Sequence, residues 1–296
     1  MSHPAIFDRM LLRARRARAS KLDPATFLLD RVATDLAARL SAVLRTFDLA
    51  ADLGTPTDAV RRALADRVGT IIAVDSIPAH LNAGTPAVAA DDEALPFRDG
   101  SLDLVVSALA LQFVNDLPGT LIQIRRALKP DGLFLAALVG GDSLGELREA
   151  FAQAEAEIES GVSPRVAPFA DLRDLGGLLQ RAGFALPVTD VDRVTVRYPS
   201  PLALLHDLRR MGATNVMTER QRKPLRRATL RRMLEVYGER FADPDGRVRA
   251  TFEIVWLSGW APHENQQQPL RPGSAKVRLA DALRTSEIPA GEKAGG

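Results

Sequence analysis

Short apolar segments alternate with helical stretches between residues 47 and 160, and this alternation limits the fold more than any other feature of the chain. The apolar segments read FDLAADLG, TIIAVD, PAVAA, LDLVVSALAL and GLFLAALVG. The helical stretches read DAVRRALADRV, PGTLIQIRRALK and SLGELREAFAQAEAEIES. Strands that alternate with helices in this way predict a mostly parallel sheet with helices on both faces.

A different pattern begins after residue 185. Apolar and polar residues alternate with a period of two in VTDVDRVTVRYPS (188–200) and in GRVRATFEIVWLSGWAP (246–262). This alternation predicts an antiparallel pair of strands that closes one edge of the sheet. The segment between the two runs, about 201–245, reads as an arginine-rich helical insertion. Together these patterns predict an α/β, Rossmann-like fold with a seven-stranded sheet.

We expect three regions along the chain. Residues 1–46 form an N-terminal helical arm, residues 47–262 form the main domain, and residues 263–296 form a C-terminal extension. The arm is rich in arginine and poor in acids, so a removable organelle presequence is the alternative to a packed arm. The last residues, from about 287, are rich in Gly, Ala, Pro and charge and are expected to be disordered.

Composition excludes several classes of protein. The chain has no cysteine, which rules out disulfides, thiolate zinc sites and cysteine nucleophiles. No apolar run approaches the ~18 to 20 residues of a membrane span, and no secretory signal is recognisable, so we expect a cytoplasmic protein. The net charge of +2 is too small to indicate a partner. No metal site is expected, because the histidines are widely separated: His3, His80, His206 and His263.

An aspartate stands at the carboxyl end of each of the first three expected strands: Asp52, Asp75 and Asp91. Ligands of open α/β sheets bind beyond these ends, where an acid can accept hydrogen bonds from both ribose hydroxyls. A single aspartate after a strand is more often a turn former or a helix cap. Three of them after successive strands favour a nucleotide-like cofactor.

The segments ADLG, IIAVD, DDEALPF, LDLVVSALALQFVNDL and LKPDGLFLAAL resemble the class I S-adenosylmethionine-dependent methyltransferases. Further segments, GGDSLGELR, SPRVAPFADLRDLG and GWAPHENQQQPLRPGSA, resemble the methyltransferase-fold assembly factors of respiratory complex I, a family described as protein-arginine hydroxylases. The segment SALALQFVNDL is also similar to the malonyl carrier-protein methyltransferases of biotin synthesis.

This resemblance implies S-adenosylmethionine as the cofactor and gives roles to particular residues. Asp52 and Gly54 would border the methionine part of the cofactor, and Asp75 would hold the ribose. The remaining implied contacts are Asp91 and Asp92 beside the adenine and Ser107 lining the cleft.

The glycine turn departs from the family pattern. Pro56 and Asp58 stand where the second and third glycines are usual. Proline lacks an N–H donor, and Asp58 places a negative charge where the cofactor carboxylate arrives, a repulsion of ~1 kcal/mol at a high effective dielectric. A shifted loop, or Arg61 or Arg62 nearby, would compensate for that charge.

Candidate substrate-side residues follow the fourth and fifth expected strands. Gln112 and Asn115 would orient a carbonyl or a guanidinium group, or cap the next helix. Asp142 would meet a cationic substrate, or belong to a plain strand-to-helix turn. No catalytic residue is assigned.

The insertion is dense in cations, which indicates either an acidic partner or a solvated helical face paired with Glu219, Glu235 and Glu239. Nucleic acid is not expected, because aromatic residues are not interleaved with the basic ones. The cations are Arg209, Arg210, Arg220, Arg222, Lys223, Arg226, Arg227, Arg231 and Arg232.

The function expected first is S-adenosylmethionine-dependent methyl transfer to a protein substrate. The resemblance implies a subunit of respiratory complex I as that partner. Two alternatives stay open: a protein-arginine hydroxylase, which the resemblance implies, and a non-catalytic assembly factor with a degenerate cofactor loop, which Pro56 and Asp58 favour.

Overall fold

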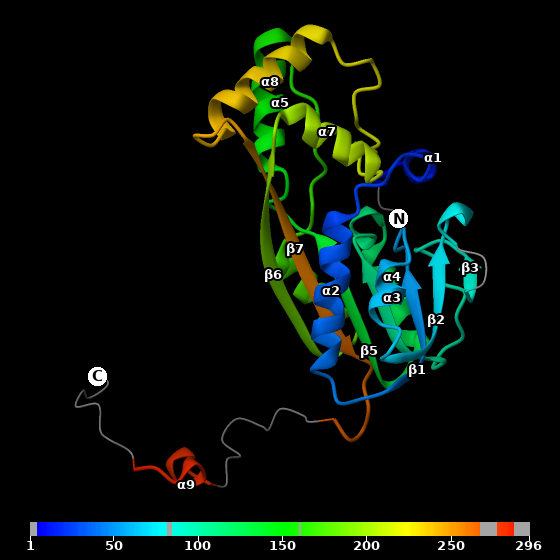
Figure 1. Ribbon diagram of the computed structural model, residues 1–296. Coiled ribbons are helices and arrows are strands. Elements are labelled where there is room, and N and C mark those ends of the chain that lie inside the picture. The colour runs from blue at the N-terminus through cyan, green and yellow to red at the C-terminus, as the bar shows by residue number, and fades with distance from the viewer. Residues whose placement is uncertain (1–4, 82–84, 160, 267–276, 287–296) are drawn as a thin grey trace. The chain divides into compact units, whose positions relative to one another are not determined.

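A computed structural model describes residues 5–81, 85–159, 161–266 and 277–286 (Figure 1). Contacts divide the chain into two compact units, Met1–Pro262 and His263–Gly296. The second unit contains the short helix α9 (Leu279–Leu283). The disordered end expected from about residue 287 lies outside the described residues.

The first unit is built on a seven-stranded sheet in the order β3-β2-β1-β4-β5-β7-β6. Strands β1 to β5 run parallel to one another, whereas β7 runs antiparallel to both β5 and β6. The predicted sheet with its antiparallel edge pair is therefore confirmed. The strands are β1 (Phe47–Leu53), β2 (Val68–Asp75), β3 (Ala87–Ala89), β4 (Leu102–Ala108), β5 (Leu128–Val139), β6 (Ala185–Tyr198) and β7 (Val248–Trp260).

Helices cover both faces of this sheet, because the central parallel strands bury side chains on both sides. Ala50 of β1 faces one core with α2, α3, α5, α7 and α8, while Ala51 faces the other core with α4 and α6. The helices are α1 (Arg9–Ala19), α2 (Phe27–Ser41), α3 (Ala59–Ala63), α4 (Leu117–Ala127), α5 (Gly145–Ile158), α6 (Leu172–Arg181), α7 (Pro201–Arg210) and α8 (Arg227–Phe241). No helix in the described ranges is long and apolar enough to span a bilayer.

The strand order places a switch point between β1 and β4. The chain leaves β1 toward β2 on one side of the sheet, and it leaves β4 toward β5 on the other. A crevice opens at such a point, beyond the carboxyl ends of the strands.

The N-terminal arm and the insertion come together above this crevice (Figure 1). Phe7, just before α1, pairs with Met217 of the insertion, and Asp8 donates its N–H to the carbonyl of Val216 at 2.8 Å. The Asp8 carboxylate also pairs with Arg220 at 3.2 Å. The arm is thus tied to the insertion, and α1 lies between the insertion and the strand ends.

Candidate functional site

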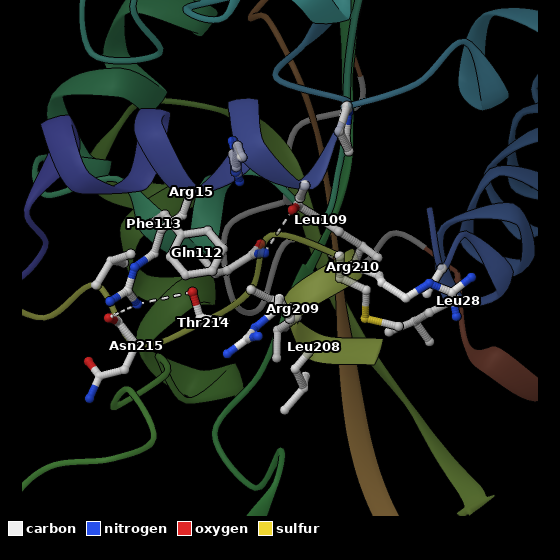
Figure 2. A pocket seen from close by; sticks show the side chains of 18 of the residues that line it. Arg15, Leu28, Leu109, Gln112, Phe113, Leu208, Arg209, Arg210, Thr214 and Asn215 are labelled. Carbon is white, nitrogen blue, oxygen red and sulfur yellow. Dashed lines mark hydrogen bonds between the residues drawn. The ribbon is translucent and has the colours of Figure 1, made fainter. Parts of the chain in front are cut away.

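A cavity of about 700 Å³ opens at the carboxyl ends of the parallel strands (Figure 2). Its sheet side consists of the loop after β1, at 56–58, with His80 after β2 and Leu109 and Gln112 after β4. Its other walls come from α1, α2, α5 and the insertion. Its position at the switch point makes it the candidate site for a cofactor and a substrate.

Asp52, at the end of β1, is buried and does not line this cavity. Its carboxylate pairs with Arg61 Nη1 at 2.7 Å and accepts a hydrogen bond from the Thr55 hydroxyl. Burial raises the pKa of Asp52 to about 6, although the Thr55 hydroxyl and the Arg61 charge act in the opposite direction. The side chain therefore holds the loop after β1 to the start of α3.

Gly54 and Ser107 lie deeper than the resemblance implied. Gly54 has a φ of +69°, and a Cβ there would stand 2.7 Å from the Cβ of Ala110, so the chain itself fills the space beside it. Ser107 is fully buried and donates its hydroxyl to the Leu53 carbonyl at 2.8 Å. Ser107 thus joins β4 to β1, Gly54 donates its N–H to Val74 of β2 at 2.7 Å, and neither residue lines the cavity.

Asp75, at the end of β2, is buried behind His80. One carboxylate oxygen accepts the Ile77 N–H at 2.7 Å, and the other lies 2.8 Å from His80 Nδ1. His80 lines the cavity and Asp75 does not. From the sequence, His80 was a candidate only as a metal ligand, although its position five residues after Asp75 was a signal for this pairing.

Asp91 and Asp92 are held by arginines of α1. Arg9 Nη2 lies 2.6 Å from Asp91 Oδ1 and 3.3 Å from Asp92 Oδ2, and Arg13 pairs with the other oxygen of Asp91. Burial raises the pKa of Asp91, but the Glu93 N–H and the two arginines outweigh it and hold that pKa below its ordinary value.

Arg16, one turn further along α1, is also buried. Its guanidinium lies 5.2 Å from the ring centre of Phe113. Burial lowers the pKa of Arg16, while the charges of Asp92 and Asp75 raise it. Arg9, Arg13 and Arg16 thus form one face of α1, turned toward the strand ends. We call Asp52, Asp75, Asp91 and Asp92 the strand-end acids; each has a cationic or histidine partner within the chain.

Of the substrate-side candidates, only Gln112 lines the cavity. Its amide nitrogen donates to the Leu109 carbonyl at 2.7 Å, and its Oε1 has no hydrogen-bond partner among the described residues. Asn115 uses both amide atoms on the backbone of Phe7, at 2.8 and 3.1 Å. Asp142 is exposed and pairs with Arg193 at 2.8 Å. The structure therefore separates Asn115 and Asp142 from the cavity.

The altered glycine turn contributes two residues to the cavity wall, Pro56 and Asp58. Arg62 Nη1 lies 2.7 Å from Asp58 Oδ1, so the extra negative charge has a cation beside it, as one of the sequence-based alternatives required. Because both groups are solvent-exposed, the pair is worth well under ~1 kcal/mol to stability. Within the described ranges no group of three or more His, Asp and Glu side chains is placed to hold a metal ion, and His3 lies outside those ranges.

Comparisons with known proteins agree with this geometry. A family model described as a methyltransferase domain matches residues 51–136. The chain is 38% identical to the mitochondrial arginine-hydroxylase NDUFAF5 of Danio rerio over 96% of this chain and 91% of that protein. It is 36% identical to the malonyl-[acyl-carrier protein] O-methyltransferase of Halorhodospira halophila, over 92% of this chain and 94% of that protein.

Solved structures support the fold. The YcgJ protein of Bacillus subtilis superposes with a TM-score of 0.54 at 14% identity, covering 77% of this chain and 98% of that one. With the domain match, this confirms the predictions of a class I methyltransferase fold and of a methyltransferase that uses S-adenosylmethionine.

The cytoplasmic location expected from the sequence is wrong by the same comparisons, because the NDUFAF5 relatives are named as mitochondrial proteins. That expectation rested on the lack of a recognisable secretory signal and of an apolar span. Neither feature distinguishes the cytoplasm from the interior of an organelle.

Proposed function

We propose, from the premise that this chain belongs to the family of the NDUFAF5 arginine-hydroxylases, that it is a class I methyltransferase acting on a protein substrate in respiratory complex I assembly. The cavity at the switch point between β1 and β4 carries this proposal. The cavity lies between the edge of the sheet where the cofactor is expected and a cover formed by α1 and the insertion.

The residues at the strand ends fit S-adenosylmethionine. A cavity of about 700 Å³ is in the usual range for such ligands, which is roughly 300 to 1,000 Å³. Among the described residues each carboxylate oxygen of Asp75 has one hydrogen-bond partner and can accept a second, so Asp75 has capacity for two ribose hydroxyls once His80, which covers it, moves aside.

In the proposed arrangement Asp75 holds the ribose, and Asp91 and Asp92 lie beside the adenine. Because α1 arginines now occupy these acids, the adenosine exchanges with Arg9, Arg13 and Arg16 when it binds. Asp52, Gly54 and Ser107 maintain the conformation of the loop after β1 from the side away from the cavity. Arg62 offsets the charge of Asp58 where the methionine carboxylate lies.

S-adenosylmethionine, when bound, supplies a methyl group on a sulfonium centre. The chain's own contribution is to orient the acceptor and exclude water, since methyl transfer depends largely on positioning. Gln112 is the candidate orienting group, because its unpartnered Oε1 can accept a hydrogen bond from the acceptor. Leu144, Leu147 and Phe169 supply apolar wall that excludes water.

The test of cofactor binding is calorimetric titration of the full-length protein with S-adenosylmethionine, with thermal melting as a check on folding. We expect binding in the parent protein, a loss of at least about tenfold in Asp75→Asn, and no change in Asp48→Asn. Asp48 is a matched control, because it is an exposed carboxylate at the opposite end of β1. No binding in the parent protein would overturn the proposal and favour the non-catalytic assembly factor.

The names of the relatives favour a second candidate, hydroxylation of an arginine in a protein substrate. That reaction needs an oxidant, and no step toward it is derived from the described residues. The two candidates differ in the mass that they add. Incubation with candidate complex I subunits, followed by intact-mass measurement and a tritiated methyl label, separates an added methyl group from an added oxygen atom.

A further inference from the structure

We propose that the mouth of the large cavity contains a binding site for an anionic group of the substrate, a carboxylate or a phosphate attached to an apolar segment. The site consists of Arg15 and Arg18 of α1 and Arg209 of α7, which we call the cation triad. The inference rests on the proposed function in one respect, that the acceptor part of the substrate enters the large cavity.

The cation triad lines a second cavity of about 270 Å³ together with Ala19, Leu22 and Thr214. This smaller cavity adjoins the large one, since Arg15, Ala19, Arg209 and Thr214 line both. Figure 2 shows Arg15, Arg209 and Thr214 among the side chains around the large cavity. A ligand could therefore place one group among the arginines and another in the large cavity.

No carboxylate within the described ranges forms an ion pair with a member of the triad. Arg15 donates only to neutral oxygens, the Thr214 hydroxyl at 3.0 Å and the Asn215 carbonyl. Nearby arginines are treated differently: Arg210 pairs with Asp23 and Asp207, and Arg165 pairs with Glu155. Arg165 and Arg210 are thus neutralised by carboxylates at the cavity wall, whereas the members of the triad have no such partner among the described residues.

The positive charges of the triad repel one another when no ligand is bound. Burial lowers the pKa of Arg15, and the positive charges of Arg220, Arg18 and Arg209 lower it further, while the negative charge of Asp8 acts in the opposite direction without outweighing them. Like charges in a partly desolvated site repel one another, and an anion between them would remove that repulsion. Guanidinium groups match carboxylate and phosphate oxygens with paired N–H donors, so the triad has the chemistry for either group.

The walls beyond the triad define the rest of the ligand. Leu28, Leu205, Leu208, Phe169 and Val216 give the large cavity a mostly apolar lining. For a protein substrate, this means an acidic or phosphorylated residue flanked by apolar side chains. A substrate guanidinium would be repelled at the triad and would have to lie elsewhere in the cavity.

The test uses three amphiphiles of equal chain length: octanoate, octyl phosphate and octylammonium, each titrated into the full-length protein by calorimetry. We expect at least one of the two anions to bind and the ammonium compound not to bind. The stronger of the two anions identifies the group that the triad prefers. Equal binding of the cation, or no binding of either anion, would overturn the inference.

Two variants locate the site. Arg18→Gln and Arg209→Gln are expected to weaken binding of the preferred anion by roughly tenfold each, because each removes a charge-assisted contact. Arg231→Gln, an exposed arginine of α8 whose nearest carboxylate is Glu235, is the matched control and should leave binding unchanged. Equal weakening in all three variants would mean nonspecific attraction and would reject the site.

These measurements need neither cofactor nor turnover, so they separate the two proposals. Anion binding without S-adenosylmethionine binding would retain the triad and reject the methyltransferase function. Cofactor binding without anion binding would do the reverse.

Discussion

Helix α1 contacts two of the strand-end acids and also supplies two members of the cation triad, yet all the acids are paired, whereas no member of the triad has an ion pair among the described residues. Arg9, Arg13 and Arg16 of α1 face the acids, whereas Arg15 and Arg18 face the cavity mouth. A paired charge must give up its partner before it can hold a ligand. A charge without a carboxylate partner has no ion pair to lose.

This difference assigns two tasks to α1. Its acid-facing arginines hold the arm on the strand ends, and a cofactor that reaches Asp91 must displace them. Of its mouth-facing arginines, Arg15 donates hydrogen bonds to Thr214 and Asn215 of the insertion, and Arg18 has no side-chain hydrogen bond or ion pair among the described residues. Variants on the two sides should therefore differ in stability as well as in binding.

The largest effect is expected where the chain is most tightly packed around the acids, in Gly54→Ala. A Cβ there would stand 2.7 Å from the Cβ of Ala110 and 3.2 Å from Asp92 Oδ1, at a φ of +69°. Overpacking and left-handed strain together should lower the free energy of unfolding by about 3 to 4 kcal/mol. Urea denaturation measures this loss.

Gly100→Ala is the matched control, because Gly100 has a φ of +62° and no atom within 4 Å of an added Cβ. It should cost only the strain, about 1 kcal/mol. Equal losses in the two variants would show that close packing beside Asp92 does not constrain the loop.

The next largest effect is expected in the pH dependence of stability, from the titration of the buried Asp52 and the half-exposed Asp91. The pKa of Asp52 is raised from 3.8 to about 6 in the folded protein, so the folded state binds this proton more tightly than the unfolded chain does. The stability that Asp52 contributes is therefore lost as the pH rises from 3.8 to about 6. Over this range the free energy of unfolding should fall by roughly 3 kcal/mol. Asp52→Asn should remove this fall.

Asp91 has the opposite sign, because its pKa is lowered by the Glu93 N–H and the α1 arginines despite burial. Its contribution is present above pH 3.8 and is lost as the pH falls below that value. Asp91→Asn should therefore lower stability above pH 3.8, weaken the loss of stability in acid, and keep the fall between pH 3.8 and about 6. Denaturation midpoints across pH check both variants. A rise in stability through the Asp52 window would contradict the assignment.

The sequence pattern was sufficient to predict the strands of the sheet, but it was insufficient to predict the contacts of the site residues. Apolar runs such as FDLAADLG and TIIAVD predicted parallel strands correctly, because successive residues in the second half of each strand are buried on both faces of the sheet. The period-two run at 246–262 likewise predicted β7, which pairs antiparallel with β5 and β6. The aspartates were also placed correctly at the strand ends.

The partners of Asp52 and Asp75, Arg61 and His80, lie nine and five residues away, but the partners of Asp91 and Asp92 are far away in sequence and could not be read from the chain. Arg9 lies 82 residues before Asp91, and Asn115 lies 108 residues after Phe7, to which it is bound. Spacing did contain a partial signal: Arg9, Arg13 and Arg16 recur at helical intervals, as Arg15 and Arg18 do on another face. Which face meets acids and which meets a cavity depends on tertiary packing.

A smaller effect is expected from Arg9→Gln on the paired side of α1. The side chain of Arg9 is 14% exposed and contacts Asp91 and Asp92, and the Asp92 side chain is 4% exposed. Loss of these contacts should lower the free energy of unfolding by about 1 to 2 kcal/mol. The same change removes a competitor of the cofactor, so binding of S-adenosylmethionine in calorimetry should tighten. Weaker cofactor binding in a folded variant would contradict the exchange between α1 and the adenosine.

The smallest effect on stability is expected on the unpaired side, in Arg18→Gln and Arg209→Gln. Neither arginine has a carboxylate partner within the described ranges, and each adds to the positive potential around Arg15. Their removal should change the free energy of unfolding by no more than about 0.5 kcal/mol, or raise it slightly as repulsion is relieved. Urea denaturation beside Arg9→Gln makes the comparison direct. A loss as large as that of Arg9→Gln would mean that the triad supports the arm, and the two sides of α1 would no longer differ in task.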